Sequence, residues 1–386
     1  MLPGRVGVAG LSLVALACVG EPPRHSATPP APVAIELPPP TAMPVEKPVA
    51  SAPPPGAPAV ADAGGAAFDL ALEEVPSGRW SGAQGNTPMS VGRIWGASGH
   101  VFVVGNGVIL HSADRGLHWL ATAGPAGWPG VWGSSIDDVY VGGSTVVRST
   151  DRGQTWTPVA AVEGSVTSVW GSGPEDVYVV GKGKSPFVAR TRDHGRTWTT
   201  QRPSTDADWL YAVAGRGPDD VWIAGKGSKK DPKSSIGYHT TAILVRSTDG
   251  GRSWKSVTPA KSAMTDNEEI RNLCFSGSGT LFASYSYGVF TTADHGKSWS
   301  FAVDGGGEIL GLGCFGREIL VGARNRNFRH SVDEGATWTS DDLDRVWRDP
   351  ALFTLQAMFV ADTGEVYVGG EAYNRSGGGT LVRRAP

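Results

Sequence analysis

The stretch Ser149-Thr150-Asp151-Arg152-Gly153-Gln154-Thr155-Trp156 contains a pattern that occurs six times in the 386-residue chain. Each copy has a Ser or Thr, an Asp two positions later, a Gly four positions later and a Trp seven positions later. The six aspartates are Asp114, Asp151, Asp193, Asp249, Asp294 and Asp333. Asp and Ser/Thr side chains hydrogen-bond to the backbone of tight turns, Gly adopts a positive φ without strain, and Trp buries a large flat surface. The pattern therefore predicts a hairpin turn that leads into a strand, repeated six times.

A second pattern alternates with the first and sets the number of repeats. An apolar strand such as Val131-Trp132-Gly133 is followed by a β-branched and aromatic strand such as Asp138-Val139-Tyr140-Val141-Gly142. Seven copies of this pair occur, and the aspartates of the repeated turns lie 37, 42, 56, 45 and 39 positions apart. Such intervals are typical of one propeller blade per repeat. With a strand on each side of every turn, the chain is predicted to be all-β, a seven-bladed β-propeller of four-stranded antiparallel blades.

The repeated turn resembles the Asp-box (BNR) repeat of sialidases, sortilin-type receptors and photosystem II assembly factors. The resemblance implies a propeller in which the aspartates shape turns and take no part in catalysis. It also implies that the turns lie on the face opposite the ligand-binding loops. Sortilin-type and assembly-factor propellers hold polypeptide partners, whereas sialidases are enzymes, so the resemblance implies a fold more firmly than an activity.

The seventh repeat is incomplete, which predicts how the ring closes. It ends with Thr380-Leu381-Val382-Arg383, and no repeated turn or fourth strand follows. Residues near Arg79 to Gln84 resemble a strand that leaves a repeated turn. We expect this N-terminal strand to complete the last blade, because pairing the two ends removes an exposed sheet edge. The alternative is that Trp80 belongs to a loose linker.

The N-terminal part of the chain has the composition of an export signal and a linker. Arg5 precedes an apolar segment over 6–17 that is too short to span a bilayer. Ala15-Leu16-Ala17-Cys18 resembles the lipobox of bacterial lipoproteins, which implies that Cys18 carries a lipid anchor in the cell envelope. Ordinary cleavage and secretion is the alternative. We therefore predict a signal peptide over 1–18, a Pro/Ala-rich linker over 19–77 and the propeller over 78–386.

Charge and cysteine content argue against several classes of function. The net charge is −3 and no region is strongly basic, so no nucleic-acid partner is expected, and the membrane is reached only through the lipid anchor. The chain has no Cys-x-x-Cys or His-Glu-x-x-His motif, so neither a metal site nor a cofactor is predicted. Cys274 and Cys314 fall in the innermost strands of adjacent predicted blades. In an oxidising compartment they either form a disulfide or remain two buried thiols.

Candidate binding residues lie in the loops between blades and in those between second and third strands. Tyr, Trp and Arg side chains suit stacking and bidentate bonding to a peptide or sugar. They concentrate in the predicted fifth to seventh blades, where the candidates are Tyr285, Tyr287, Arg324, Arg326, Trp347, Arg348, Tyr373 and Arg375. The loops between blades add Trp209, Glu268 and Glu269. The alternative is that these loop tips are merely solvated.

The preferred functional interpretation is a monomeric, envelope-tethered propeller that binds a protein, peptide or glycan without catalysis. A sialidase-like glycoside hydrolase is the first alternative, but no spacing identifies the arginine triad that sialidases require, and the early Phe-Arg-Ile-Pro motif is absent. Xyloglucanases that carry the Asp box use two propellers, and this chain has length for one. A purely structural envelope scaffold is the second alternative.

Overall fold

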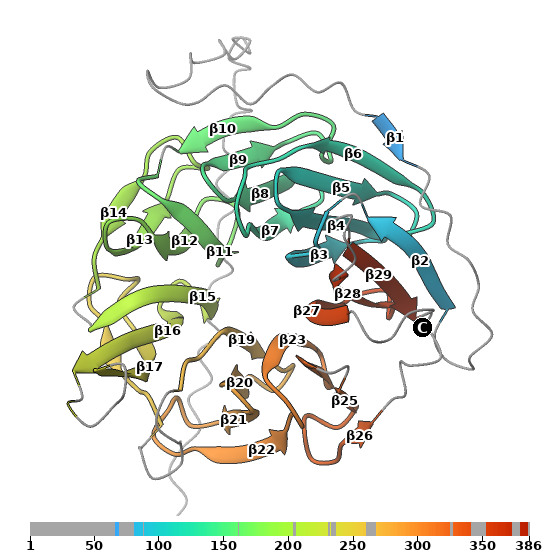
Figure 1. Cartoon of the computed structure of the whole chain (residues 1–386). Helices are drawn as coiled ribbons and strands as arrows, with labels where there is room; N and C mark the ends of the chain where they lie inside the picture. The colour runs from blue at the N-terminus through green and yellow to red at the C-terminus, as the bar shows by residue number, and fades with distance from the viewer. Residues whose placement is uncertain are drawn as a thin grey trace, which may run out of the picture. The chain divides into compact units, whose positions relative to one another are not determined.

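The structure is a computed structural model that describes residues 66–68, 81–87, 89–160, 162–203, 206–230, 232, 237–259, 268–324, 327–340, 353–372 and 379–384. All of them belong to one compact unit, Ala52–Pro386. Their strands form seven sheets with antiparallel neighbours (Figure 1). In this part of the chain, no helix has the length and apolar character needed to cross a membrane. The predicted export signal and most of the predicted linker lie outside the described residues.

The strands follow one another outward from the centre in each of the first six blades. Blade 1 contains β3 (Arg93–Ala97), β4 (His100–Gly105), β5 (Val108–Ser112) and β6 (Trp119–Ala123), and blade 2 contains β7 (Gly130–Ser135), β8 (Asp138–Gly142), β9 (Val146–Ser149) and β10 (Thr157–Ala160). Blade 3 contains β11 (Ser165–Gly171), β12 (Val177–Lys182), β13 (Pro186–Thr191) and β14 (Thr199–Gln201), and blade 4 contains β15 (Ala207–Gly217), β16 (Asp220–Lys230), β17 (Tyr238–Ser247) and β18 (Lys255–Ser256). Blade 5 contains β19 (Asn272–Phe275), β20 (Leu281–Ser284), β21 (Gly288–Thr292) and β22 (Ser300–Asp304), and blade 6 contains β23 (Ile309–Phe315), β24 (Glu318–Ala323), β25 (Phe328–Ser331) and β26 (Thr339–Ser340).

Blade 7 joins the two ends of the ring. It contains β27 (Phe353–Val360), β28 (Val366–Ala372), β29 (Gly379–Arg384) and, outermost, the early strand β2 (Ser81–Thr87). β2 runs antiparallel to β29, with Ser81 opposite Arg383 and Thr87 opposite Gly379. The predicted seven-bladed ring, closed by an N-terminal strand, is thus confirmed, although the strand begins at Ser81 and Trp80 lies outside the described residues.

Blade 1 carries a fifth strand that the sequence did not predict. β1 (Ala66–Phe68) pairs with β6 at the outer edge of the sheet, with Phe68 opposite Trp119. These residues fall in the predicted linker, because a three-residue strand is too short to produce an alternating pattern. The addition satisfies backbone groups that the edge strand would otherwise leave unpaired.

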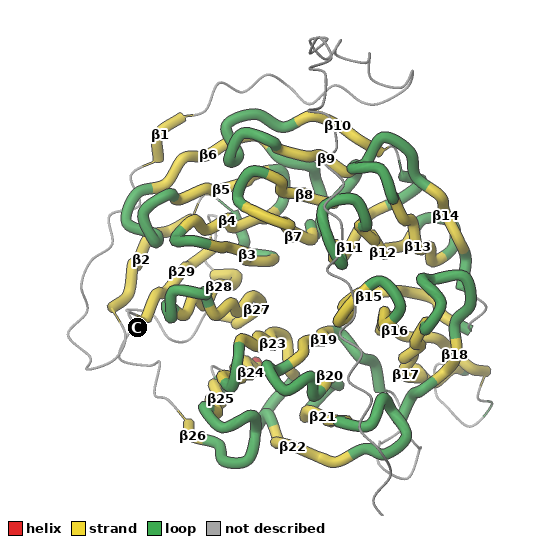
Figure 2. The backbone as a smooth tube through the Cα atoms, turned by 180° about the vertical axis from the view of Figure 1, so that it is seen from behind, coloured by secondary structure: helices red, strands yellow, loops and turns green. Residues whose placement is uncertain are grey.

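The core consists of buried apolar clusters between the blades. Seven clusters are found among the described residues, and each contains side chains from two adjacent blades. Figures 1 and 2 show the same arrangement from opposite sides, with the first strand of each blade nearest the centre. Since each blade buries its faces against its neighbours, the ring has to close for every blade to be fully packed.

The repeated turns are hydrogen-bonded in the way their residue types predict. In the second turn, the Ser149 hydroxyl donates to the Asp151 carboxylate (2.8 Å) and accepts the Gly153 backbone N–H (2.8 Å). The Asp151 carboxylate also accepts the backbone N–H of Thr155 (2.9 Å) and its hydroxyl. Each of the other five turns has the same hydroxyl-to-Asp bond and the same Gly bond to the hydroxyl. The Asp and the hydroxyl thus replace backbone partners inside the turn.

The glycine of each turn also makes room for the preceding blade. Gly251 has φ of +76°, and a Cβ there would lie 3.1 Å from the Tyr178 ring of blade 3. The corresponding aromatic residues against the other five glycines are Tyr367, Phe102, Tyr140, Trp222 and Phe282. Blade 6 precedes the one blade that lacks a repeated turn, and it has Leu320 at this position of its second strand. The aromatic and the glycine therefore form one contact between blades, which explains why the two patterns alternate in the sequence.

A partly buried acid–arginine pair links blades 2, 3 and 4 to the blade that follows each of them. In blade 2, Arg148 Nε donates to Asp138 (2.6 Å), and its Nη1 donates to the His194 carbonyl in the turn of blade 3 (3.2 Å). Arg190 bonds in the same way to Asp176 and to the Gly250 carbonyl in the turn of blade 4. Each arginine thereby fixes the position of the next turn through a charge-assisted bond.

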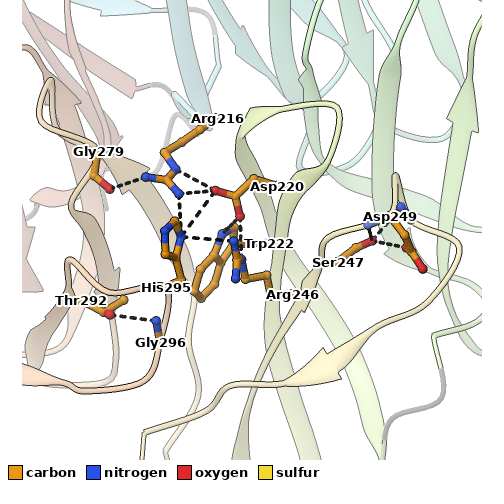
Figure 3. A network of polar contacts seen from close by, with 11 residues as sticks. Arg216, Asp220, Trp222, Arg246, Ser247, Asp249, Gly279, Thr292, His295 and Gly296 are labelled. Atoms are coloured by element: carbon orange, nitrogen blue, oxygen red, sulfur yellow. Dashed lines mark hydrogen bonds and ion pairs between the residues drawn. The ribbon is translucent and has the colours of Figure 1, made fainter.

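The corresponding contact of blade 4 is larger (Figure 3). Asp220 accepts hydrogen bonds from Arg246 (2.6 Å) and Arg216 (2.7 Å), and from the indole N–H of Trp222 (2.9 Å). Burial alone would raise the pKa of Asp220, but the bonds from Arg246 and Arg216 outweigh it and lower the pKa. Both arginines also contact Nδ1 of His295, in the turn of blade 5, at 3.1 and 2.7 Å. Since arginine only donates, this nitrogen must be the unprotonated acceptor.

A disulfide connects blades 5 and 6. It joins Cys274 in β19 to Cys314 in β23, whose Cα atoms are 5.6 Å apart. The sequence left open whether these cysteines pair, and the structure shows that they do. The bond adds a covalent link between two first strands.

The turn carboxylates predict an acid sensitivity. Hydrogen bonds from Thr197, its hydroxyl first and then its backbone N–H, lower the pKa of Asp193 to about 2 from 3.8. The pKa of Asp333 is lowered to about 2 in the same way by Thr337. A carboxylate with a depressed folded-state pKa contributes stability that is present above its unfolded pKa and lost as the pH falls through the folded value. We therefore expect the melting temperature to fall between about pH 4 and pH 2.

This acid sensitivity can be measured by circular dichroism melting at pH 7, 4, 3 and 2. The variant Thr197→Val removes the largest pKa-lowering contact of Asp193, and its melting temperature should depend less steeply on pH in that range. Val replaces Thr with little change in shape, so the exposed turn keeps its packing. If the melting temperature of the wild type were constant from pH 4 to pH 2, the hydrogen bonds of the turn carboxylates would not contribute to stability as expected.

Candidate functional site

A cavity of about 300 Å³ lies where the first strands of all seven blades begin. Every blade contributes one lining residue at the same place in its repeat: Gly92, Pro129, Thr167, Tyr211, Arg271, Leu310 and Gln356. Arg93, Trp128, Trp209 and Asn272 complete the lining. Because strands alternate in direction within each blade, the starts of first strands lie on the face opposite the repeated turns. We call this site the axial cavity.

Irregular strand geometry turns several lining residues toward the axial cavity. The pairing of first and second strands shifts register at Thr167, Tyr211, Leu310 and Gln356. A bulge places two residues opposite one, so the extra side chain leaves the regular alternation of the sheet. Such irregularities often aim side chains into functional sites. Here they build a ring of non-equivalent side chains from otherwise equivalent blades.

Arg93 has no carboxylate partner among the described residues, unlike Lys226, Arg271 and Arg324 nearby. It is the first residue of β3, and its guanidinium donates to the Gly92 carbonyl at 3.0 Å. Among the described residues, no ion pair involves Arg93. Burial, followed by the charge of Arg271, lowers the pKa of the guanidinium. An arginine is still charged after such a shift, so the axial cavity contains a cation that the described protein groups do not neutralise.

A chain of ion pairs borders the axial cavity across blades 4, 5 and 6. Glu269 contacts Lys226 (3.3 Å) and Arg271, and it accepts the Tyr211 hydroxyl (3.0 Å). Glu308 then contacts Arg271 (3.2 Å) and Arg324 (2.9 Å). Burial alone would raise the pKa of Glu269, but Arg271 and the other donors outweigh this and lower it. Glu269 is therefore held as a carboxylate, and the chain as a whole fixes the position of Arg271.

Aromatic side chains form part of the cavity wall. Trp209 and Tyr211 stack at 6.0 Å between ring centroids, and the Lys182 ammonium lies 4.7 Å from the Trp209 centroid. Trp128, from the loop before β7, is 57% exposed although it is large and apolar. Exposed aromatic residues at the rim of a cavity are typical of binding sites, because they offer apolar area at a small cost in conformational entropy.

The structure brings together only part of the predicted site. Arg324 joins the ion-pair chain at the axial cavity, and its side chain is 51% exposed. Tyr285 and Tyr287 lie in the loop between β20 and β21 on the same face, but neither lines the axial cavity. Tyr285 stacks on Phe290 at 4.9 Å, whereas Tyr287 is 59% exposed. The remaining predicted residues, Arg326, Trp347, Arg348, Tyr373 and Arg375, lie outside the described residues.

Most of the cavity wall was not predicted from the sequence. Trp209 and Glu269 were among the predicted loop candidates, but Arg93, Tyr211 and Arg271 were not. A signal for Tyr211 and Arg271 does exist, because the seven equivalent lining residues all stand two positions before the apolar residue of the first-strand pattern, as Tyr211 does before Val213. Reading that one position across the repeats would have found one lining residue in each blade, but not Arg93, which stands one position later in its repeat.

No arrangement of metal ligands accompanies the axial cavity. No group of three or more His, Cys, Asp or Glu side chains suited to a metal ion occurs in the part of the chain that the structure describes. The lining instead combines one unpaired guanidinium, aromatic faces and amide groups. This set suits recognition of a ligand through charge and stacking.

Comparisons with known proteins identify the fold. No family model matches the chain, and no curated protein is similar to it in sequence. A structure of YCF48 bound to D1 peptide is 15% identical with a TM-score of 0.57, and the match covers 82% of this chain and 99% of that one. YCF48 from Cyanidioschyzon merolae is 17% identical with a TM-score of 0.57, covering 80% and 99%. A GH74 enzyme of Niastella koreensis is 13% identical with a TM-score of 0.52, covering 78% of this chain but 55% of that enzyme. At these identities the likeness shows the fold alone, which is that of a seven-bladed β-propeller.

Proposed function

We propose that this propeller is a binding module that holds a polypeptide partner over the axial cavity and performs no chemistry on it. The observation that carries the proposal is the cavity itself, a concave site with aromatic walls and a charged group that lacks a protein partner. The fold of YCF48, of which one structure has a bound D1 peptide, lends support at the level of architecture. Propellers commonly use this face, where the loops vary without disturbing the blades.

Glycoside hydrolysis is the second candidate, favoured by one contact. The Tyr211 hydroxyl donates to Glu269 beside Arg271, and a sialidase-type reaction needs a Tyr nucleophile with a Glu partner. Two features argue against it. Burial and the charge of Glu269 raise the pKa of Tyr211, which makes the phenolate less accessible. Glu269 is also bound by Lys226 and Arg271, which lowers its basicity. We therefore prefer binding without turnover.

Binding can be tested with the purified full chain and an array of random decapeptides. We expect saturable binding of a subset of peptides, measured as a change in tryptophan fluorescence. Trp128→Ala should weaken that binding at least about tenfold, because Trp is among the residue types that most often dominate the affinity of an interface. Phe315→Ala is the matched control, since Phe315 is 46% exposed and is the last residue of β23, at the opposite face. If both variants lost affinity equally, or if neither lost affinity, the axial cavity would not be the binding site.

The same preparation separates the two candidate functions. No turnover of a fluorogenic sialoside or of xyloglucan is expected. Turnover that persists through purification and is lost in Tyr211→Phe would favour the hydrolase instead.

We propose that the protein works as a monomer outside the cytoplasm, tethered through Cys18. The Cys274–Cys314 disulfide supports an oxidising compartment, since such bonds persist mainly in exported proteins. The variant Cys18→Ser is expected to move the protein from the membrane fraction to the soluble fraction, which immunoblotting would detect. A variant that stays in the membrane fraction would disprove the lipid anchor.

A further inference from the structure

We propose that Arg93 binds a carboxylate of the partner polypeptide, so that the axial cavity recognises an acidic group rather than a neutral one. This inference rests on the proposed function, because it specifies the ligand chemistry of the same site. Its basis is the difference between Arg93 and the three cations of the ion-pair chain beside the cavity. Lys226, Arg271 and Arg324 each contact a glutamate, whereas Arg93 contacts only a backbone carbonyl among the described residues.

The missing partner of Arg93 has a physical cost. A guanidinium in a cavity has lost part of its hydration, and the charge of Arg271 nearby adds repulsion. Neither cost is offset by a carboxylate in the described protein. A ligand carboxylate would offset both, since guanidinium and carboxylate form two parallel hydrogen bonds with matching geometry.

The size of the cavity limits what can enter. About 300 Å³ lies at the lower end of ligand pockets, which suits the end of a chain or one side chain rather than a folded segment. The carboxylate therefore comes either from a free C-terminus or from an Asp or Glu side chain. Trp128 and Tyr211 would contact the apolar part of the same residue.

The first experiment uses N-acetyl-L-tyrosine and its neutral amide as probes, with ligand-observed NMR on the full chain. We expect the acid to bind and the amide to bind at least about tenfold more weakly, as expected for loss of a charged hydrogen bond. Arg93→Gln should abolish the difference between acid and amide, and Arg93→Lys should retain part of it. The control Arg252→Gln makes the same charge change in an exposed turn on the opposite face and should have no effect.

The folding of the variants is monitored at the same time. The melting temperature of Arg93→Gln should be unchanged or higher, because the variant loses no ion pair within the described protein and removes a repulsion with Arg271. If Arg93→Gln bound the acid poorly and also had a lower melting temperature, its loss of binding would be a folding effect. The Arg93→Lys variant would then be the test, because it keeps the charge and should still prefer the acid to the amide. Equal binding of acid and amide to the wild-type chain would overturn the inference.

The second experiment separates this inference from the proposed function. Peptides selected on the array are resynthesised as C-terminal amides and, separately, with Asp and Glu replaced by Asn and Gln. Loss of binding in the first set assigns a C-terminal carboxylate, and loss in the second assigns a side chain. If peptides bind but neither change matters, the proposed function stands and the inference fails. If no peptide binds while N-acetyl-L-tyrosine binds through Arg93, the inference about a carboxylate site stands and the proposal of a polypeptide partner is wrong.

Discussion

Deletion of residues 81–87 is expected to abolish cooperative unfolding of the whole propeller, although it removes only the outermost strand of one blade. β2 covers the edge of β29, whose Leu381 and Val382 are at most 1% exposed. Without β2 that edge is open and blade 7 loses part of its packing against blade 1, where Leu381 belongs to the same buried cluster as Val91 and Tyr367. The free energy of unfolding of a domain is only about 5–15 kcal/mol, so losing the edge strand and part of the packing between blades 7 and 1 removes a large share of it.

The measurement is chemical denaturation followed by both far-ultraviolet circular dichroism and tryptophan fluorescence. The matched control is deletion of residues 66–68, which form the additional strand β1 at the outer edge of blade 1. That deletion should leave a single transition with a small change in midpoint. If the chain lacking residues 81–87 still unfolds in one transition at the wild-type midpoint, β2 does not close the ring.

Trp222→Ala is expected to lower the free energy of unfolding by about 3–5 kcal/mol, the usual cost of removing a large buried aromatic side chain. Trp222 is 1% exposed and packs between blades 4 and 5, against the glycine of the turn that contains His295. Its indole N–H donates to Asp220, and the Arg246 guanidinium lies 5.3 Å from its ring centroid. The variant thus removes packing and also disturbs the network of Figure 3.

Trp128→Ala is the control for Trp222→Ala. Trp128 is 57% exposed, so its replacement should change the free energy of unfolding by less than about 0.5 kcal/mol. Guanidinium chloride denaturation of both variants and the wild type would give the comparison. Similar small changes in the two variants would show that blade 4 is not held to blade 5 through Trp222.

The sequence predicted the fold because its strongest signals are local. A hydroxyl residue, an Asp and a Gly within five positions suffice to specify a turn, and Ser149, Asp151 and Gly153 make the expected bonds to one another. The ring closure was predictable for a similar reason, since a repeat that lacks its last strand needs one from elsewhere. The positions of the aromatic residues in the second strands were visible too, but their contacts with the glycines of the next blade were not.

The candidate site was harder to predict because it depends on register across all seven blades. Tyr211 and Gln356 face the axial cavity only because the strands shift register there, and no residue type marks such a shift. The loop residues predicted from the sequence therefore included Tyr285 and Tyr287, which the structure places on the correct face but outside the lining of the cavity. The pairing of Cys274 with Cys314 likewise required the spacing of two first strands, which only the assembled ring provides.

The shared seventh blade has a consequence for how the chain can be connected. Ser81 lies opposite Arg383, so the beginning and the end of the ring are neighbours in a single sheet. A short linker from the end of β29 to the start of β2 would span them, and new ends could then be opened in any loop between blades. The blade at which the chain starts is therefore not fixed by the fold, and we expect circular permutants to form the same ring with the same axial cavity. In such permutants the membrane tether could be attached at any chosen blade, while the axial cavity would stay the same.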